Sequence, residues 1–205
     1  IFHSLVLAYW DTGVCPESWL RGRLKLLPKK GDLQNPSNWR GIMLLEAAVK
    51  IVGIIIAGRL EQVLDKKGLE AQCGFMKHRG TSDGSFTLKV ALQKRKEHGL
   101  GTWVLFVDLV KAFDSVDRDL MLHVLRKFGI PFKLVQLIRA LHEGMEVSFS
   151  AGSVEGSVAA TVGVKQGDTL APILFLFVMQ AAMETLQPAL EQEGVHAPQF
   201  LFKMD

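Results

Sequence analysis

The chain is poor in cysteine and has no clustered histidine. Its two cysteines, Cys15 and Cys73, lie far apart, and neither has a neighbouring Cys or His at zinc-ligand spacing. The six histidines form no HxxxH or HExxH pair. A disulfide framework and a zinc site are therefore poorly supported. We expect free, largely buried thiols in a reducing, intracellular compartment: the nucleus, the cytoplasm or both.

Long hydrophobic runs and a secretory signal are also lacking. The most apolar run, residues 170–183, is interrupted by Gln180 and is too short to cross a bilayer, so we predict no membrane partner. The chain begins at Ile1 rather than at a methionine and ends soon after the apolar residues 200–202. Both ends are expected to be cuts through a larger protein.

Neither charge sign dominates the composition. There are 24 Lys and Arg against 21 Asp and Glu, a formal charge of +3. This mildly basic balance permits a polyanionic partner without demanding one. The 205 residues, 48% of them hydrophobic, are enough for one large globular domain or two small ones that share a core.

The stretch at residues 102–117 contains an apolar run that ends in an acid. Residues 104–107 are all apolar, and Asp108 follows them. This pattern predicts a strand buried on both faces whose last residue carries a charge. A carboxylate in that position is costly unless a cation meets it. Mg²⁺ is such a cation, because it takes carboxylates and substrate phosphates together.

A second unusual element is a glycine-bracketed turn, Gly163–Gly167, that leads into a strongly apolar helix. The helix is predicted from Thr169 to about Glu193, with a bend near Pro188.

Cations gather in the turn-rich loop of residues 28–40. Lys29, Lys30 and Arg40 have no obvious acidic partners nearby in the sequence. Two interpretations stand side by side: an ordinary solvated loop, or a hairpin whose cations hold phosphate oxygens.

Periodicity predicts the remaining elements. Helical spacing favours a core helix over residues 42–65, and Ser115 or Asp117 can cap a helix that starts at Arg118. The full set comprises helices at 2–10, 42–65, 84–97, 118–128 and 132–142, a strand at 19–28, and a hairpin with strands at 146–150 and 157–162.

Four motifs in order resemble those of the reverse transcriptase domain of non-LTR (LINE-like) retrotransposons. They are Lys29–Gly31 through Asn38–Ile42, Gln72–Phe75 with Arg79–Asp83, motif A at 106–117 and motif B at 163–175. One such motif would be weak evidence, but four in order are strong. The resemblance implies an α+β fold with the fingers and partial palm of a right-hand polymerase, an antiparallel palm sheet packed on helices. Residues 1–101 would be the fingers-like region and 102–205 the partial palm.

The resemblance also implies a role for each site residue. Asp108, with the main-chain carbonyl of Leu109, would bind metal, two Mg²⁺ ions being expected in the longer parent. The ring of Phe113 would exclude a ribose 2′-hydroxyl and so favour dNTP over rNTP. Two further groups would bind nucleotide: Gln166 and Gly167 in the nucleotide and template pocket, and Lys29, Lys30 and Arg40 on the triphosphate. The partners would be an RNA template, a DNA primer and dNTP.

The chain departs from the family pattern in one important respect. The family supplies two adjacent aspartates in a later hairpin, and this sequence has no such pair. We therefore expect the chain alone to bind nucleotide weakly and to catalyse little. Among smaller departures, Asp168 stands where cysteine is frequent and would add a charge near the nucleotide. Asp114 and Asp117 are expected to be structural or capping residues rather than metal ligands.

Two functional hypotheses follow from the motifs. In the first, the chain is part of an RNA-directed DNA polymerase that acts by two-metal phosphoryl transfer in a longer protein. In the second, it is a non-catalytic module, derived from such an enzyme, that binds RNA. An ordinary α/β domain would account for Asp108 but not for four ordered motifs. Oligomeric state is not predicted.

Overall fold

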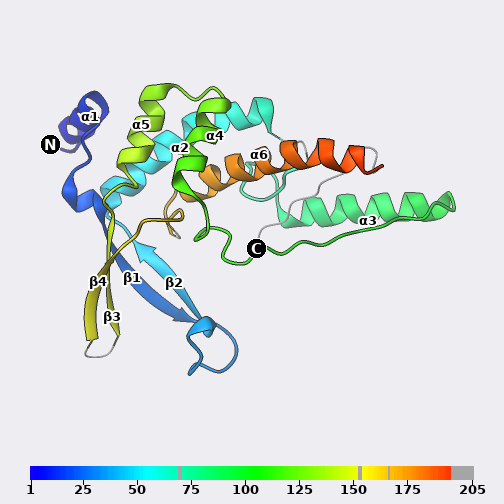
Figure 1. Cartoon of the computed structure of the whole chain (residues 1–205), viewed down its shortest axis with the longest axis horizontal. Helices are drawn as coiled ribbons and strands as arrows, with labels where there is room; N and C mark the ends of the chain where they lie inside the picture. The colour runs from blue at the N-terminus through cyan, green and yellow to red at the C-terminus, as the bar shows by residue number, and fades with distance from the viewer. Residues whose placement is uncertain (69–70, 152–153, 166, 195–205) are drawn as a thin grey trace. The chain divides into compact units, whose positions relative to one another are not determined.

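The computed structural model describes residues 1–68, 71–151, 154–165 and 167–194, which form α-helices and one four-stranded sheet (Figure 1). The chain divides into two compact units. Unit 1 contains residues 1–63 and 111–178, and unit 2 contains residues 64–110 and 179–205. This division differs from the predicted fingers at 1–101 and palm at 102–205, which remains a prediction about functional subdomains.

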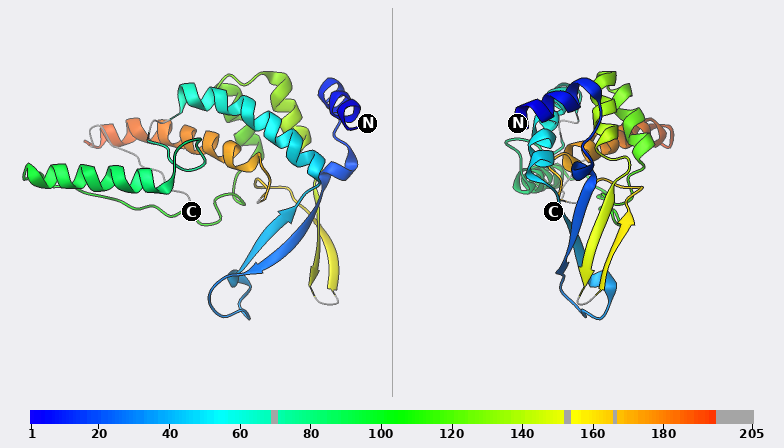
Figure 2. Two further views of the ribbon diagram at one scale, coloured as in Figure 1. Left: turned by 180° about the vertical axis from the view of Figure 1, so that it is seen from behind. Right: turned by 90° about the vertical axis from the view of Figure 1, so that its left-hand side faces the viewer.

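Two hairpins make up the sheet of unit 1. The strands are β1 (Arg21–Pro28), β2 (Trp39–Leu44), β3 (Glu146–Ala151) and β4 (Val154–Ala159). Their order is β2-β1-β3-β4, antiparallel within each hairpin and parallel where β1 meets β3. Figure 2 shows the two hairpins side by side. The predicted α+β class is confirmed, with a mixed sheet, and the second hairpin forms close to its predicted strands.

The core of unit 1 lies among its helices. Tyr9 of α1 (Phe2–Thr12) donates a hydrogen bond to the carbonyl of Leu137 and packs edge-on against Trp19, which is in the short 3-10 helix η1 (Glu17–Leu20). The helices α4 (Arg118–Lys127) and α5 (Phe132–Ala140) each bury one apolar face, as their spacing predicts. The buried residues of these faces are Met121, Leu122, Val124, Leu125, Leu134, Val135, Leu137 and Ile138.

The predicted core helix at 42–65 is wrong at its start. Ile42 belongs to β2, where it pairs with Lys25, and the helix α2 (Ala47–Lys67) begins after it. Apolar residues happen to follow helical spacing in this segment as well, but its main-chain N–H and C=O groups form hydrogen bonds with β1. Further along, α2 buries Val49, Val52 and Ile56 as expected.

The predicted buried strand at 104–108 does not form. These residues have no regular secondary structure, and the side chains of Leu105 and Phe106 are 86% and 81% exposed. A strand needs a neighbour for its N–H and C=O groups, whereas the strands of the described residues come from 21–44 and 146–159 and pair with one another. An apolar run alone supplies no such neighbour.

In unit 2, α3 (Thr81–Glu97) begins after Gly80 rather than at the predicted Gly84. The Asp83 carboxylate accepts a hydrogen bond from the Gly80 N–H at 2.6 Å, which caps the helix.

Cys73 is buried and Cys15 half-buried, and both thiols are free, as predicted.

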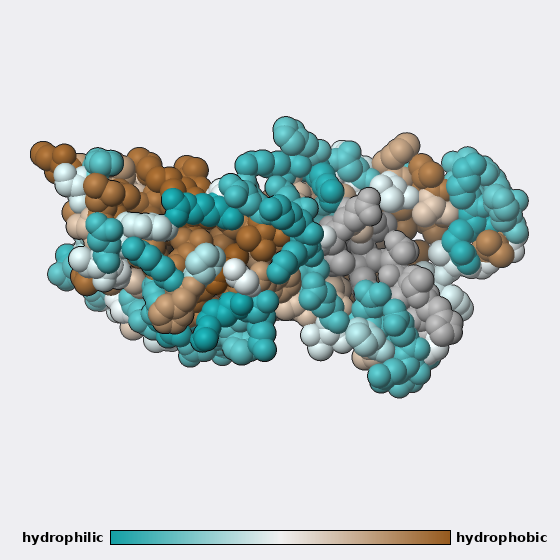
Figure 3. Space-filling view, turned by 90° about the horizontal axis from the view of Figure 1, so that it is seen from above, coloured by the Kyte–Doolittle hydropathy of each residue, from teal (hydrophilic) through white to brown (hydrophobic). Residues whose placement is uncertain are grey.

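The last helix, α6 (Ala171–Gln192), passes from unit 1 into unit 2. By length and composition it could cross a membrane, so the expectation that its apolar run is too short was wrong. Leu174 and Phe177 in its first turns are fully buried in unit 1, as in the core helix of a domain. By contrast, α1 exposes the apolar side chains of Phe2, Leu5 and Leu7. Hydrophobic side chains gather at the left end of Figure 3, where α1 lies.

Candidate functional site

The predicted triphosphate-binding cations lie at the tip of the β1–β2 hairpin. Lys29, Lys30 and Arg40 are all exposed there, and Arg40 stands opposite Leu27 in the strand register. Among the described residues, no carboxylate forms an ion pair with any of the three. The Lys29 ammonium group donates to the Ser37 carbonyl at 3.3 Å, and the binding of phosphate oxygens by these three cations stays a prediction.

The loop between the two strands is held by its own hydrogen bonds. The Lys29 N–H donates to the Asn38 carbonyl at 2.7 Å, and the Asn38 side-chain amide donates to the Asp32 carbonyl at 2.7 Å. The Trp39 indole N–H donates to the Leu33 carbonyl at 3.0 Å. The loop includes the short 3-10 helix η2 (Pro36–Asn38). These hydrogen bonds fix the conformation of the loop next to the three cations before any ligand binds.

The predicted pocket glycine, Gly167, lies against β2. Its φ of 108° is in the region that favours glycine, and a Cβ at this position would come within 2.7 Å of the Met43 main-chain oxygen. The turn that leads into α6 thus approaches the strand that carries Arg40. The neighbouring Gln166 lies outside the described residues.

Phe113 belongs to a turn that pairs with the same glycine-bracketed segment. The Val164 N–H donates to the Phe113 carbonyl, and the Gly163 N–H donates to the Val116 carbonyl, both at 2.9 Å. A Cβ on Gly163 would come within 2.7 Å of the Asp114 main-chain oxygen. These contacts place the C-terminal half of motif A directly beside motif B.

Unit 1 therefore contains residues of three of the predicted motifs: Phe113 lies beside the turn that starts at Gly163, Gly167 lies against β2, and Arg40 is at the other end of that strand. The chain crosses from unit 2 into unit 1 between Val110 and Lys111, so the predicted metal-binding residues, Asp108 and Leu109, belong to unit 2. Both are exposed.

Of the two remaining acids of motif A, Asp117 is a capping residue, as the sequence predicts, whereas the role of Asp114 stays a prediction. The Asp117 carboxylate accepts a hydrogen bond from the Leu120 N–H at 2.8 Å and caps α4. Asp114 is exposed. In the part of the chain that the structure describes, no three His, Cys, Asp or Glu side chains are placed to hold a metal ion. Asp108 and the Leu109 carbonyl are hard oxygen donors that suit Mg²⁺, but one carboxylate is too few for two ions.

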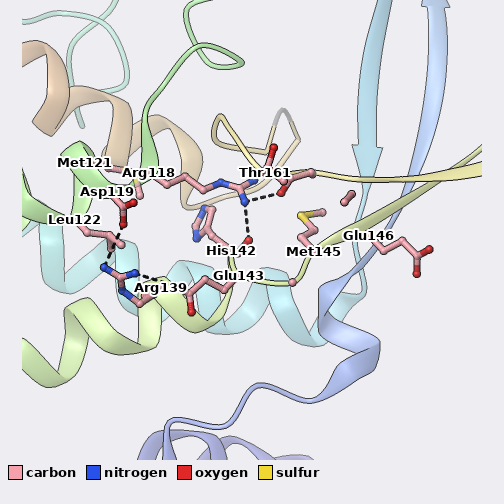
Figure 4. Close-up of a pocket in the computed structure, with 13 residues that line it drawn as sticks. Arg118, Asp119, Met121, Leu122, Arg139, His142, Glu143, Met145, Glu146 and Thr161 are labelled. Carbon is pink, nitrogen blue, oxygen red and sulfur yellow. Dashed lines mark hydrogen bonds and ion pairs between the residues drawn. The ribbon is translucent and has the colours of Figure 1, made fainter.

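Sequence reasoning missed Arg118, whose guanidinium group reaches from the first turn of α4 to four main-chain carbonyls. Nε donates to Gly163 at 2.9 Å, Nη1 to His142 at 2.7 Å and to Ala160 at 2.6 Å, and Nη2 to Val162 at 3.2 Å. Figure 4 shows Arg118 turned toward the main chain, whereas Arg139 turns to the carboxylates of Asp119 and Glu143. No spacing signal in the sequence marks this role, because the acceptors are backbone atoms distant along the chain.

Motif B itself contains two buried charged residues, Lys165 and Asp168. The Lys165 ammonium group is almost fully buried and donates to the Leu141 carbonyl at 2.6 Å. Asp168 is also buried, and its carboxylate accepts a hydrogen bond from the Leu170 N–H at 3.1 Å. Burial lowers the pKa of Lys165 and raises the pKa of Asp168, and the attraction between them opposes both shifts. Asp168 is thus buried in the turn that precedes α6, and the expectation that it adds a charge near the nucleotide stays a prediction.

His142 belongs to the same region. It is 2% exposed, its Nδ1 lies 2.8 Å from the Ile138 carbonyl, and its Nε2 has no hydrogen-bond partner. Burial, with the nearby charges of Lys165 and Arg118, lowers its pKa to about 3. His142 also lines a cavity of about 500 Å³ (Figure 4), which none of the predicted site residues lines.

Comparisons with known proteins agree with the motifs. Residues 27–201 match the family described as "Reverse transcriptase (RNA-dependent DNA polymerase)". The sequence is 33% identical to the "Retrovirus-related Pol polyprotein from type-1 retrotransposable element R2" of Popillia japonica over 85% of this chain and 25% of that protein. It is 31% identical to the corresponding polyprotein of element R2DM from Drosophila melanogaster, over 85% of this chain and 16% of that protein. It is 30% identical to the transposon TX1 149 kDa protein of Xenopus laevis, over 87% of this chain and 14% of that protein.

Among solved structures, an apo telomerase from Candida tropicalis, truncated from its C-terminal domain, superposes with a TM-score of 0.56. The match covers 89% of this chain and 44% of that one at 13% identity, so it bears on the fold alone. The chain spans a quarter or less of the length of the three relatives.

Proposed function

This chain belongs to the reverse transcriptase (RNA-dependent DNA polymerase) family, in its non-LTR retrotransposon class, and from that premise we propose that it forms the nucleotide-selecting part of an RNA-directed DNA polymerase. In this proposal it supplies the fingers and part of the palm of a longer polypeptide. That polypeptide extends a DNA primer with dNTP along an RNA template.

One observation carries the proposal. The turn at Gly163–Gly167 contacts the Phe113 turn through main-chain hydrogen bonds and approaches β2 at Met43. Residues from three separate stretches of sequence are thereby gathered in one unit, next to the strand whose far end carries Arg40. An ordinary α/β domain gives no reason for this convergence.

Each side chain has a chemical task in the proposed reaction. Arg40, with Lys29 and Lys30, binds triphosphate oxygens, because a guanidinium fork and ammonium groups donate to several oxygens at once. Phe113 places its ring where a 2′-hydroxyl would have to fit. Gly167, which has no Cβ, lets the backbone approach the base pair closely.

Asp108 and the Leu109 carbonyl would hold magnesium in this proposal. Two bound Mg²⁺ ions would lower the pKa of the primer 3′-hydroxyl and neutralise the leaving pyrophosphate. The second set of carboxylates would come from the longer polypeptide, since the sequence has no adjacent aspartate pair.

The decisive experiment is primer extension by the longer polypeptide on an RNA template. We expect Asp108→Asn to reduce extension by at least about a thousandfold, because it removes a metal-binding charge. Binding of a short RNA, followed by fluorescence anisotropy, should change little. Asp65→Asn is the matched control, since Asp65 is an exposed aspartate of the same unit. It should leave both measurements unchanged.

Two results would overturn the proposal. Full extension by Asp108→Asn would remove Asp108 from the chemistry. A wild-type polypeptide that binds RNA but never extends the primer would instead indicate a non-catalytic RNA-binding module.

A further inference from the structure

The geometry points to Arg118 as a positioning residue for nucleotide selection. Its guanidinium group holds the segment that leads into motif B, residues 160–163, next to motif A, and so sets where Phe113 and Gly167 lie. This inference rests on the proposed function, but its physical basis lies within unit 1 and can be tested separately. Arg118 is not among the residues proposed to contact nucleotide.

The guanidinium group ties two distant segments to the start of α4. Three of its acceptors, the carbonyls of Ala160, Val162 and Gly163, lie in the segment between β4 and motif B. The fourth, the carbonyl of His142, follows the end of α5. Arg118 itself is held at the first position of α4, directly after the Asp117 cap. One side chain thus joins α4, the end of α5 and the approach to motif B.

Only arginine can make this set of contacts. Its planar fork presents five N–H donors in fixed directions, whereas a lysine ammonium group is a single point with three donors. A lysine at this position keeps the positive charge but cannot reach carbonyls on both sides of the fork. Removing the side chain leaves several half-buried carbonyls without their donor, which is unfavourable.

The consequences should travel along the backbone to the proposed nucleotide site. Gly163 accepts from Arg118 through its oxygen and donates through its nitrogen to the Val116 carbonyl. Val164, the next residue, donates to the Phe113 carbonyl. A loosened segment at 160–163 would therefore weaken both hydrogen bonds that hold the Phe113 turn, and would shift the turn that ends at Gly167. Misplacement by about 1 Å is enough to impair a reaction strongly.

Hydrogen exchange of the 205-residue chain tests the physical link. In Arg118→Lys, the amides of Gly163 and Val164 should exchange at least about tenfold faster than in the wild type, because their partners are less firmly held. Amides in α5 should keep their protection, which shows that the fold is intact. Arg139→Lys is the matched control: Arg139 pairs with the carboxylate of Asp119 on α4 and with that of Glu143 just after α5. This variant should leave the exchange of Gly163 and Val164 unchanged.

Primer-extension kinetics of the longer polypeptide test the functional link. Arg118→Lys should raise the KM for dNTP by about tenfold, with a smaller change in kcat, and should lower the preference for dNTP over rNTP. A purely structural role would lower the amount of active protein, and hence the apparent kcat, without changing KM or this preference. Arg139→Lys should change neither.

The outcomes separate the two ideas. Unchanged exchange at Gly163 and Val164 in Arg118→Lys would overturn the inference, as would faster exchange with unaltered KM and sugar preference. If Arg118→Ala fails to fold, that failure does not support the inference, because the result for Arg118→Lys is the one that tests it. A wild-type polypeptide without extension activity would defeat the proposed function, and with it the functional part of the inference.

Discussion

The ring of Phe113 stacks on the ring of Phe175, with the two centroids 5.0 Å apart and the planes inclined by 28°. Phe175 lies in the buried first turns of α6, so the ring of Phe113 packs on a side chain that is itself held in the core. A bulky side chain can exclude a substrate group only if it cannot rotate away, and this stack restricts rotation of the ring. The proposed discrimination between sugars thus has a structural support that the motif alone does not reveal.

Phe113→Val should relax the exclusion of ribonucleotides in the longer polypeptide. The smaller side chain opens space where the 2′-hydroxyl would fit, so the ratio of kcat/KM for dNTP to that for rNTP should fall by about tenfold or more. Single-nucleotide incorporation measures both values. Phe132→Val, at an exposed phenylalanine of the same unit, is the control and should not alter the ratio. An undiminished ratio in Phe113→Val would remove this ring from sugar selection.

Gly167→Ala should destabilise unit 1. The glycine has a φ of 108°, and an added Cβ would approach the Met43 oxygen to 2.7 Å, so backbone must move. We expect a loss of about 1–3 kcal/mol in the free energy of unfolding, measured with urea. Gly58→Ala is the control, because its added Cβ meets nothing within 4 Å in α2 and should slightly stabilise the helix. Equal stability of the two variants would contradict the close approach.

Arg40→Ala should weaken dNTP binding rather than the fold. Arg40 is exposed, so the free energy of unfolding should hardly change. Loss of a charge-assisted contact to phosphate should raise the KM for dNTP by about tenfold, with less effect at high salt. Lys127→Ala removes the same charge from the exposed end of α4 and should leave KM unaltered. If both variants raise KM equally, net charge rather than a specific contact is responsible.

The parts that sequence predicted well are those whose signal is local. The apolar faces of α4 and α5 follow helical spacing, and Asp117 caps the helix that it precedes. The errors arose where a distant partner decides: Ile42 joins β2 because β1 lies beside it, and residues 104–108 form no strand because none of the described strands pairs with them. Motif matching named Phe113 and Gly167, but not the Phe175 stack or Arg118. Those contacts join segments far apart in sequence, and no periodicity records them.

His142 should make the chain less stable in mild acid. Its pKa falls from the ordinary 6.5 to about 3 in the folded chain, chiefly through burial and then through the charges of Lys165 and Arg118. The unfolded chain therefore binds a proton on this side chain below about pH 6.5, and the folded chain does not until about pH 3. The stabilising contribution is complete above pH 6.5 and declines as the pH falls, by up to about 1.4 kcal/mol per pH unit.

Buried Asp168 acts in the opposite direction, because its raised pKa favours the folded chain as the pH falls into its range. A comparison of the wild type with His142→Gln cancels the contribution of Asp168, because both proteins keep Asp168 and differ only in the titrating imidazole. Between pH 7 and pH 5, the wild type should lose about 2 kcal/mol more in the free energy of unfolding than His142→Gln, measured with urea. His123→Gln, at an exposed histidine of α4, should follow the wild type. If wild type and His142→Gln lose the same amount, His142 is not held neutral by burial, and the charges of Lys165 and Arg118 do not act on it.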